Sequence, residues 1–442
     1  MSGARVSVWV DCYGGYELVG AIEMRDIGLS FAYAPSYQGP AISARMPLRA
    51  EPFSEHETET FFHALAPEGE TRLELLRSMH AERSEWLPLL QRLGDESSGA
   101  LVFGLNDEIP GGHEEYEPVA DDYIEGLARD PSSVAVEMLG STRVSVAGAM
   151  RKVGLYRSEG GRSWYRTRGA APTTHILKVP NESLFPLETI NEAICLTVAG
   201  LCGIETEEFE LVPTETATIL AARRFDRPIP DQPLLVSDLA RPRRLHQEDL
   251  CQLGDTSIKY EPTGGYYLSF AKRLVRGACA NAFGEAMGLL CHVYIDYLLG
   301  NCDNHLKNFS VLYDEGMREA QLSPAYDMLD TTIYARVKSE MGVPVSFDRS
   351  IVGVSYEDLV GAVQHAGFPE ELALGEFETV RDEVLGRFHK ACDIVAAWGF
   401  AREVERLSTP MWQGLKARAS FSFSEDDRAY LDARGLGDDV RK

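Results

Sequence analysis

The stretch Leu298-Leu-Gly-Asn-Cys-Asp-Asn-His-Leu-Lys-Asn-Phe-Ser310 is a polar loop that follows an apolar segment. Asp303 and Asn308 lie five residues apart in it. A carboxylate can orient a hydroxyl group and accept its proton, and an amide oxygen completes a Mg²⁺ shell without adding negative charge. Asp327, which apolar residues flank farther along the chain, offers a second oxygen ligand. The pattern predicts a base, Asp303, beside a Mg²⁺ site made by Asn308 and Asp327. Taken singly, these residues also fit a polar loop and a helix N-cap.

A loop of small residues lies upstream, in Ser145-Val-Ala-Gly-Ala-Met-Arg-Lys152. Ala147, Gly148 and Ala149 would let backbone N–H groups approach phosphate oxygens, because small residues permit a close approach. Arg151 and Lys152 add positive charge at its end. The loop therefore predicts a phosphate-binding turn, and an ordinary hairpin turn is the alternative.

A lysine in an apolar strand is the next feature. Lys178 lies between Leu177 and Val179 in a strand-like run, where an ammonium group is costly unless it meets an anion. Glu192, on the helix expected over 187–201, would hold that ammonium group by a salt bridge. We predict that Lys178 contacts phosphate during catalysis, and a lysine on an edge strand that reaches water is the alternative.

Composition excludes several classes of protein. The chain has 442 residues and a formal net charge of −25. Such acidity argues against a protein that binds nucleic acid directly, because phosphate contacts need clustered Lys and Arg. It also argues against adsorption of the protein to an anionic membrane. The eight cysteines form no Cys-x-x-Cys pair, which favours free thiols in a reducing compartment. With neither a signal peptide nor a membrane span expected, we predict a cytoplasmic protein.

The chain divides by pattern into three parts. Residues 1–110 read as a β/α unit, residues 135–245 as a small β-rich unit with one helix, and residues 246–442 as a helical unit. The class expected is α+β. A small-residue loop, a strand lysine, a helix glutamate, the Asp303/Asn308 pair and Asp327, in this order, indicate a phosphotransferase of the protein-kinase type.

At these residues the chain resembles the HipA family of bacterial serine/threonine kinases, the toxins of type II toxin–antitoxin pairs. The resemblance covers almost the whole chain. The matching stretches are Ser98–Leu101, Arg143–Ala149, Pro172–Pro180, Asn191-Glu192, Arg224–Arg227, Gln247–Gln252, Ile258–Glu261, Asp303–Ser310 and Tyr326-Asp327.

The resemblance implies a kinase-like two-lobed fold, with an extra N-terminal β/α subdomain, a β-rich N-lobe that carries the ATP loop, and an all-α C-lobe that carries the catalytic loop. It implies ATP and Mg²⁺ as cofactors and autophosphorylation of Ser145, which would eject the loop and stop the reaction. Asp303 and Lys178 take the catalytic roles, and Asn308 and Asp327 hold the metal. The residues expected to bind the nucleotide are Ala147, Gly148, Ala149, Met150, Arg151, Lys152, Lys178, Arg223, Arg224, Phe225, His305, Leu306, Lys307, Asn308, Tyr326 and Asp327.

The resemblance also implies partners. It predicts a small helix-turn-helix antitoxin of the HipB type, contact with DNA only through that antitoxin, and a protein substrate in translation, with aminoacyl-tRNA synthetases as the class known for the family. Two alternatives stay open. The same fold can serve a small-molecule or lipid kinase, and the chain can act as a corepressor that binds a DNA-binding antitoxin.

Other polar residues receive structural interpretations. His246 and His292 fall in apolar helical contexts, which favours core histidines over ligands. Gln247-Glu-Asp249 is expected to start a helix and to serve as scaffold, because Asp303 already supplies the base.

Overall fold

The computed structural model describes residues 5–421, apart from 27, 67–68, 81–85, 94–95, 106–107, 109–113, 121, 131–143, 146–150, 159, 162, 261–266, 336 and 348. The chain forms two compact units. Unit 1 holds residues 1–181, 208–257 and 312–320, and unit 2 holds residues 182–207, 258–311 and 321–442. The domain boundaries expected from the sequence, at 1–110, 135–245 and 246–442, stay a prediction.

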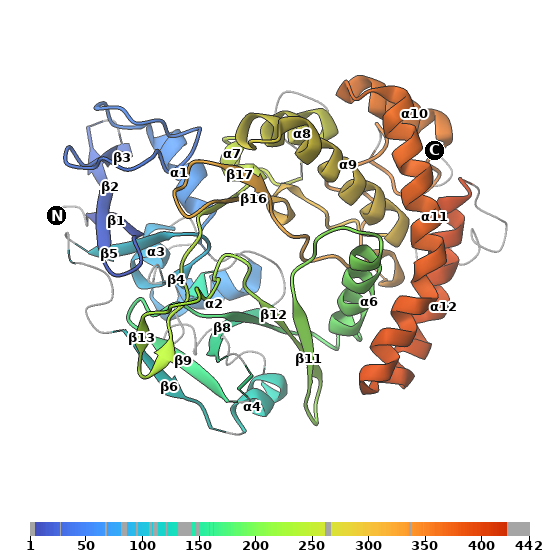
Figure 1. Cartoon of the computed structure of the whole chain (residues 1–442), viewed down its shortest axis with the longest axis horizontal. Helices are drawn as coiled ribbons and strands as arrows, with labels where there is room; N and C mark the ends of the chain where they lie inside the picture. Colours follow the sequence, from blue (N-terminus) through green and yellow to red (C-terminus); the bar gives the residue numbers. More distant parts are fainter. Residues whose placement is uncertain are drawn as a thin grey trace. The chain divides into compact units, whose positions relative to one another are not determined.

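Unit 1 opens with an antiparallel four-stranded sheet in the order β3-β2-β1-β5 (Figure 1). Every residue of β1 is buried, because β2 and β5 pair with its two edges. Three helices follow β3 in the chain, and the first of them begins at a capping box between Ser54 and Glu57. The elements are β1 (Val6–Asp11), β2 (Tyr16–Arg25), β3 (Gly28–Tyr33), α1 (Glu55–His63), α2 (Gly69–Ser78), α3 (Leu87–Leu93), β4 (Glu96–Ser97) and β5 (Leu101–Leu105).

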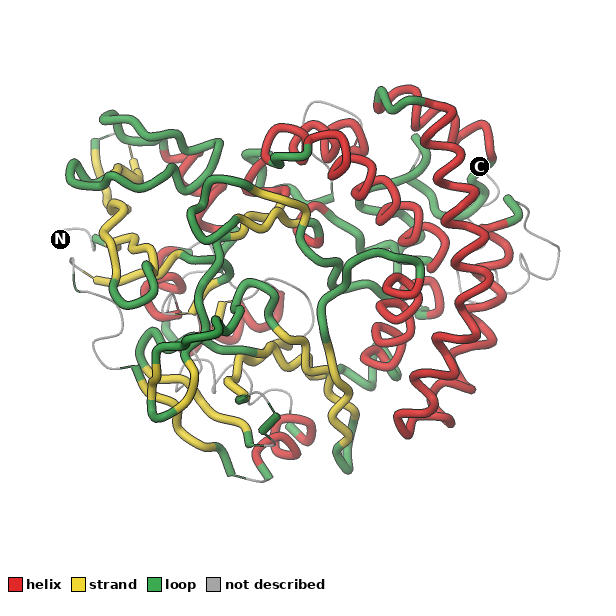
Figure 2. The backbone as a smooth tube through the Cα atoms, in the orientation of Figure 1, coloured by secondary structure: helices red, strands yellow, loops and turns green. Residues whose placement is uncertain are grey.

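The second large sheet of unit 1 has six strands, in the order β11-β12-β10-β8-β9-β6 (Figure 2). Leu177 pairs with Val153 and Ala221, and these side chains join the hydrophobic core that also contains β1 and β5. The next residue, Lys178, therefore faces the other side of the sheet. The elements are β6 (Glu115–Pro118), α4 (Tyr123–Arg129), β7 (Val144–Ser145), β8 (Arg151–Arg157), β9 (Trp164–Arg168), β10 (His175–Val179), β11 (Phe209–Pro213), β12 (Thr218–Arg223), β13 (Leu235–Val236), β14 (Leu239–Ala240), β15 (Gln247–Asp249) and α7 (Leu250–Leu253).

Unit 2 is built on helices. The central helix α9 is apolar around most of its circumference, and α8, α11 and α12 pack against it (Figure 1). Gly399, with a φ of 108°, breaks the helical path between α11 and α12. The elements are α6 (Glu188–Leu201), α8 (Tyr267–Ala278), α9 (Ala282–Leu299), η2 (Leu306–Asn308), η3 (Thr331–Ile333), α10 (Tyr356–Ala366), α11 (Glu370–Val395), η4 (Ala396–Phe400) and α12 (Ala401–Ala419).

The expectation of a helical unit over residues 246–442 needs correction. Three short strands lie in this range: β15, β16 (Ser310–Tyr313) and β17 (Ala320–Leu322). Each spans four residues or fewer, which is too short for a periodic pattern to stand out in the sequence. Within the described residues, no helix combines the length and the apolar character that crossing a membrane requires.

Candidate active site

The polar loop of unit 2 begins where α9 ends. Gly300 closes the helix with a φ of 91°, and its N–H donates to the carbonyl of Asp296. A side chain at this position would collide with the carboxylate of Asp330. A glycine is therefore required both by the backbone conformation and by the close approach of Asp330, and the chain turns sharply into the loop.

Asp296 and Asn301 fix the backbone beside Asp303. The amide Nδ2 of Asn301 donates to Asp296 Oδ1 at 2.8 Å, and Asn301 Oδ1 accepts from the N–H of Asp303 at 3.0 Å. Asp296 is fully buried, and burial raises its pKa to about 8 although hydrogen bonds from Asn301 and Asn304 lower it. A buried acid with a raised pKa thus anchors the segment that carries the expected base.

The carboxylate of Asp303 is held from one side and exposed on the other. The phenol of Tyr260 donates a short hydrogen bond to Asp303 Oδ1, and His305 Nε2 lies 3.9 Å from the same oxygen. The rings of Tyr260 and His305 meet edge to face at 5.1 Å. The side chain of Asp303 is 39% exposed, so it can receive a hydroxyl group from solvent. This geometry fits a proton acceptor with a fixed orientation.

Asn308 is suited to ligate a hard cation. It lies at the end of η2, and its Nδ2 donates to the carbonyl oxygen of Asp303 at 2.8 Å. The amide nitrogen is thus engaged, and the amide oxygen is the atom left to accept a hydrogen bond or bind a metal. Oxygen ligands of this kind are those that Mg²⁺ prefers.

Tyr326 ties Asp327 to the same loop. Its hydroxyl donates to the carbonyl oxygen of Lys307 at 2.8 Å and shares a hydrogen bond with Ser310 Oγ at 2.6 Å. Asp327, the next residue, is half-buried and has a φ of 52°, a conformation that non-glycine residues adopt rarely. Tyr326 thus connects the residue before Asp327 to the loop that contains Asn308, and both Asn308 and Asp327 carry oxygen donors of the kind that Mg²⁺ prefers.

Two lysines lie side by side in unit 1. Lys178 on β10 pairs in register with Lys152 on β8, and both are almost completely buried, at 2% and 7% exposure. Directly paired residues share one face of a sheet, with their Cβ atoms roughly 5 Å apart. The side chains of Lys152 and Lys178 therefore lie on the same buried face of the sheet, and ammonium groups are suited to bind phosphate oxygens. Arg151, by contrast, points to the opposite face, where it bonds Glu74 at 3.0 Å.

The structure describes only part of the expected phosphate loop. Ala147, Gly148, Ala149 and Met150 lie outside the described residues. The backbone of Ser145 is in β7, which pairs in parallel with β4, so that Ser145 is opposite Ser97. Glu192, the expected partner of Lys178, is buried on α6 in unit 2.

The hinge expected at Arg223 to Phe225 shows two different side-chain environments. Arg223 is 40% exposed and bonds Glu208 at 2.9 Å. Arg224 is buried and bonds Glu96 and Asp226 at 2.7 and 2.8 Å. The side chain of Arg224 is therefore committed to the interior of unit 1, and a nucleotide would meet this hinge through backbone groups.

The remaining expected residues lie within the loop or the core. Leu306 and Lys307 are buried next to Asn308. His246 and His292 are buried, as the sequence predicted, and burial lowers the pKa of each to about 4. Asp249 forms a capping box with Gln252 at the start of α7, which confirms the helix-start role.

Three residues of the site were not assigned a role from sequence: Tyr260, Asp296 and Asn301. Tyr260 lies 43 positions from Asp303, and no pattern joins them. Its only signal was its place in the stretch Ile258–Glu261. Asp296 lies within the apolar helix α9, and Asn301 lies just after its end, so neither belongs to a recognisable motif.

Two protein-family models match the chain. The model of the HipA-like C-terminal domain matches residues 144–388, and the model of the HipA N-terminal domain matches residues 10–104. A Sinorhizobium fredii protein named "Putative kinase Y4mE" is 32% identical over 335 residues, which are 72% of this chain and 76% of that protein. A second protein of that organism, "Putative kinase Y4dM", is 24% identical over 79% of this chain and 78% of its own length.

One solved structure matches nearly the whole chain. It is described as the Shewanella oneidensis MR-1 toxin–antitoxin system HipA, HipB and its operator DNA complex, and the match has a TM-score of 0.76 and 19% identity over 99% of both chains. At this identity the likeness shows the fold. It confirms the α+β, kinase-like class that the sequence predicted.

Proposed function

The chain belongs to the HipA family, and from this premise we propose that it is an ATP- and Mg²⁺-dependent protein serine/threonine kinase that acts as a type II toxin. The observation that carries the proposal is the loop around Asp303. Its carboxylate is oriented by Tyr260 and exposed on one side, and the amide of Asn308 is bonded to its backbone. This arrangement supports a base at Asp303 and a metal ligand at Asn308 in the same loop, which phosphoryl transfer would use.

Each residue of the proposed site would have one role in phosphate transfer. Asp303 accepts the proton of the attacking serine or threonine hydroxyl and aligns its oxygen. Asn308 and Asp327 hold Mg²⁺, which when bound neutralises charge on the phosphates. Lys178 and Lys152 offset the negative charge of the phosphates from the sheet side. Tyr260 and Asn301 keep the carboxylate and the backbone of Asp303 in place.

Two acceptors follow from family membership. We propose that Ser145 is an internal acceptor, because it directly precedes the small-residue loop, and that a translation-related protein, of the aminoacyl-tRNA synthetase class, is the external one. The solved relative is described with HipB and operator DNA, which supports a HipB-like antitoxin as partner and DNA contact through that partner. A net charge of −25 suits a basic partner.

The test is phosphate transfer followed by mass spectrometry. The purified chain is incubated with ATP and Mg²⁺, alone and with a bacterial lysate treated to inactivate its own kinases. We expect phosphate on Ser145 and on a small set of proteins, and none with Asp303→Ala. If an intact, ATP-binding chain phosphorylates a metabolite or lipid and no protein, the protein-kinase proposal fails.

A further inference from the structure

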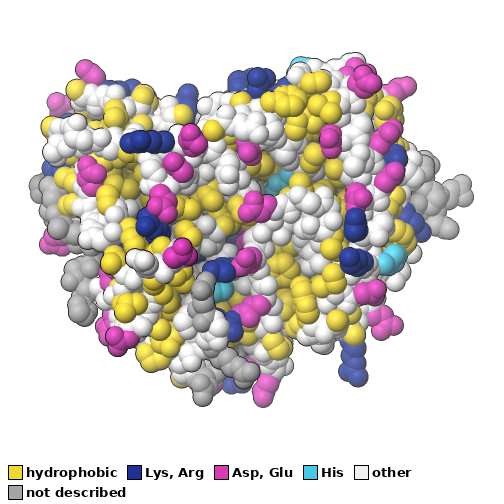
Figure 3. All heavy atoms as spheres, viewed as in Figure 1, with side chains coloured by type: hydrophobic (Ala, Val, Ile, Leu, Met, Phe, Trp, Pro, Cys, Tyr) yellow, Lys and Arg dark blue, Asp and Glu magenta, His cyan; other side chains and the backbone are white. Residues whose placement is uncertain are grey.

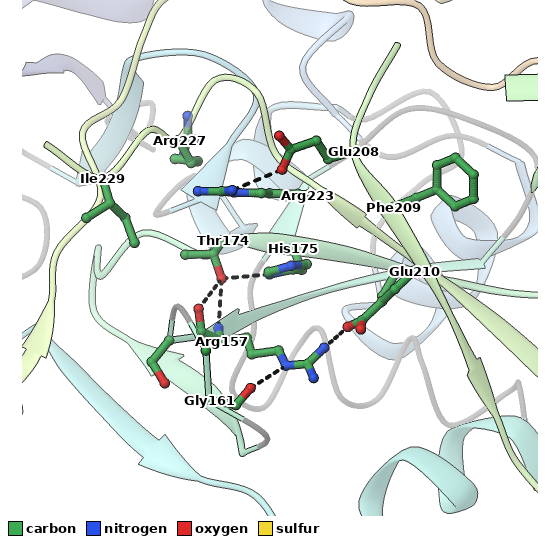
Figure 4. A pocket seen from close by; sticks show the side chains of 13 residues that line it. Arg157, Gly161, Thr174, His175, Glu208, Phe209, Glu210, Arg223, Arg227 and Ile229 are labelled. Carbon is green, nitrogen blue, oxygen red and sulfur yellow. Dashed lines mark hydrogen bonds and ion pairs between the residues drawn. The ribbon is translucent and has the colours of Figure 1, made fainter. Parts of the chain in front are cut away.

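A cavity of about 520 Å³ opens in unit 1 at one end of the six-stranded sheet (Figure 4). His175 on β10 and Arg223 on β12, which pair in register, line it together with Arg157 at the end of β8. Lys178 lies three positions beyond His175 on the same strand, so its side chain faces the other side of the sheet. The cavity is therefore separate from the face on which Lys178 and Lys152 lie.

The guanidinium group of Arg157 is held in place before any ligand arrives. Its Nε donates to the carbonyl oxygen of Gly161 at 3.0 Å, and its Cζ lies 4.7 Å from the centre of the Trp164 ring. Its ionic partner is Glu210, which is 42% exposed at the rim. A cation fixed by backbone and ring contacts loses little freedom when it exchanges one anion for another.

Arg223 presents a second cation to the same cavity. Its partner Glu208 is 73% exposed and lies 2.9 Å away. Ion pairs between exposed groups contribute about 0–1 kcal/mol, so Glu208 is easily displaced by an anion of higher charge. Both arginines are thus paired with carboxylates whose side chains are 42% and 73% exposed.

A neutral imidazole lies between the two arginines in the view of Figure 4. The Nδ1 atom of His175 shares a hydrogen bond with Thr174 Oγ1 at 2.8 Å. Burial, with smaller contributions from the positive charges of Arg157 and Arg223, lowers the pKa of His175 to about 4. The positive charges of both arginines therefore act on the ring of His175, and Glu208 and Glu210 line the same cavity.

We propose that this cavity binds the phosphate group of a small phosphomonoester. A phosphate dianion matches the two charges of Arg157 and Arg223, and guanidinium groups bond phosphate oxygens well. The apolar side chains of Phe209, Ala221 and Ile229 line the same cavity and would contact the organic body of the ligand. Its volume lies within the range of about 300–1,000 Å³ that is usual for small-molecule sites.

Calorimetric titration of the full chain tests the proposal, with inorganic phosphate and ribose 5-phosphate as probes and ribose and acetate as comparisons. We expect saturable binding of both phosphates, weakened roughly tenfold or more by Arg157→Gln or Arg223→Gln. Lys178→Met should leave this affinity unchanged. Arg168→Gln, which removes another arginine of the sheet that pairs with an exposed glutamate, is the matched control.

The histidine ring gives a second readout that does not depend on stability. In NMR spectra of the full chain, the signal of His175 is the one missing from His175→Asn, and ribose 5-phosphate should move its titration to higher pH because a nearby dianion favours imidazolium. The proposal is overturned if no saturable phosphate binding occurs below about 10 mM, if acetate binds equally well, or if only Lys178→Met abolishes binding. An unmoved His175 titration at saturation would overturn it too.

Discussion

Tyr260 is the residue whose change reports most directly on the orientation of the proposed base. Tyr260→Phe removes the donor to Asp303 and keeps the ring that packs on His305. A hydrogen bond to a charged group contributes about 1.5–3 kcal/mol, so kcat for phosphate transfer should fall about 10- to 100-fold. The KM for ATP should stay within about twofold. Steady-state kinetics check this, with Tyr356→Phe, an exposed tyrosine, as control. An unchanged kcat would show that the bond has no role in orientation.

Asp296 sets a pH dependence of stability. Its pKa is about 8 in the fold and about 4 when unfolded. Between these values the folded chain holds a proton that the unfolded chain has lost, so the free energy of unfolding falls as pH rises from about 4 through about 8. The buried histidines act in the opposite direction, below about pH 6.5.

Asp296→Asn, which resembles the protonated acid, should remove from the pH dependence a fall of about 3–4 kcal/mol between pH 5 and pH 8. Urea denaturation at several pH values measures it, and Asp382→Asn, which changes an exposed carboxylate, should leave the slope as it is. A slope that Asp296→Asn does not alter would mean that Asp296 is ionised in the fold.

Spacing alone drew attention to Asp303 and Asn308, because the two residues lie within six consecutive positions. Tyr260 and Asp296 could not be predicted, because their roles depend on contacts that only the folded loop creates. Successive residues of a strand point to opposite faces of a sheet. Which of Arg151 and Lys152 shares a face with Lys178 is therefore known only from the register between β8 and β10. The sequence assigned both basic residues to phosphate, and the structure places Arg151 on the other face beside Glu74.

Strand β4 carries Glu96, the centre of a buried ionic cluster in unit 1. Glu96 bonds Arg224, Arg227 and Arg244 at 2.5–3.2 Å, and all four side chains are buried. Removing one partner of a buried ionic cluster leaves charges uncompensated and costs about 3–5 kcal/mol. Glu96→Gln should therefore lower the melting temperature strongly. In Glu117→Gln, which breaks an exposed pair with Arg168, the loss should stay within about 1 kcal/mol. Equal losses in thermal denaturation would mean that the cluster adds nothing to stability.

The order of elements was largely predictable, because alternating apolar residues mark β1, β2, β10 and β12, and helical periodicity marks α6. Strands β4, β7, β15 and β17 were not, because two or three residues carry no period. These short strands depend on partners that are distant in the sequence. Glu96 on β4, for example, forms ion pairs with three arginines more than 120 positions away.

For the whole molecule, acidity is a property of the general surface. Figure 3 shows Asp and Glu side chains spread over the visible face rather than gathered in one patch. If a basic antitoxin is recognised by this charge, its affinity should weaken roughly tenfold or more between 50 and 300 mM salt. Calorimetry with the helix-turn-helix protein encoded by a neighbouring gene measures this affinity. An affinity that does not change with salt would contradict recognition of the antitoxin by charge.

The central claim is that the loop around Asp303 transfers phosphate, and one measurement tests it most directly. The rate of transfer from γ-labelled ATP in the presence of Mg²⁺ is compared between the natural chain and Asp303→Asn, which keeps the shape of the side chain and removes the proton acceptor. We expect transfer to fall at least about 10²-fold while ATP still binds. A variant that retains the full rate of transfer would contradict the account.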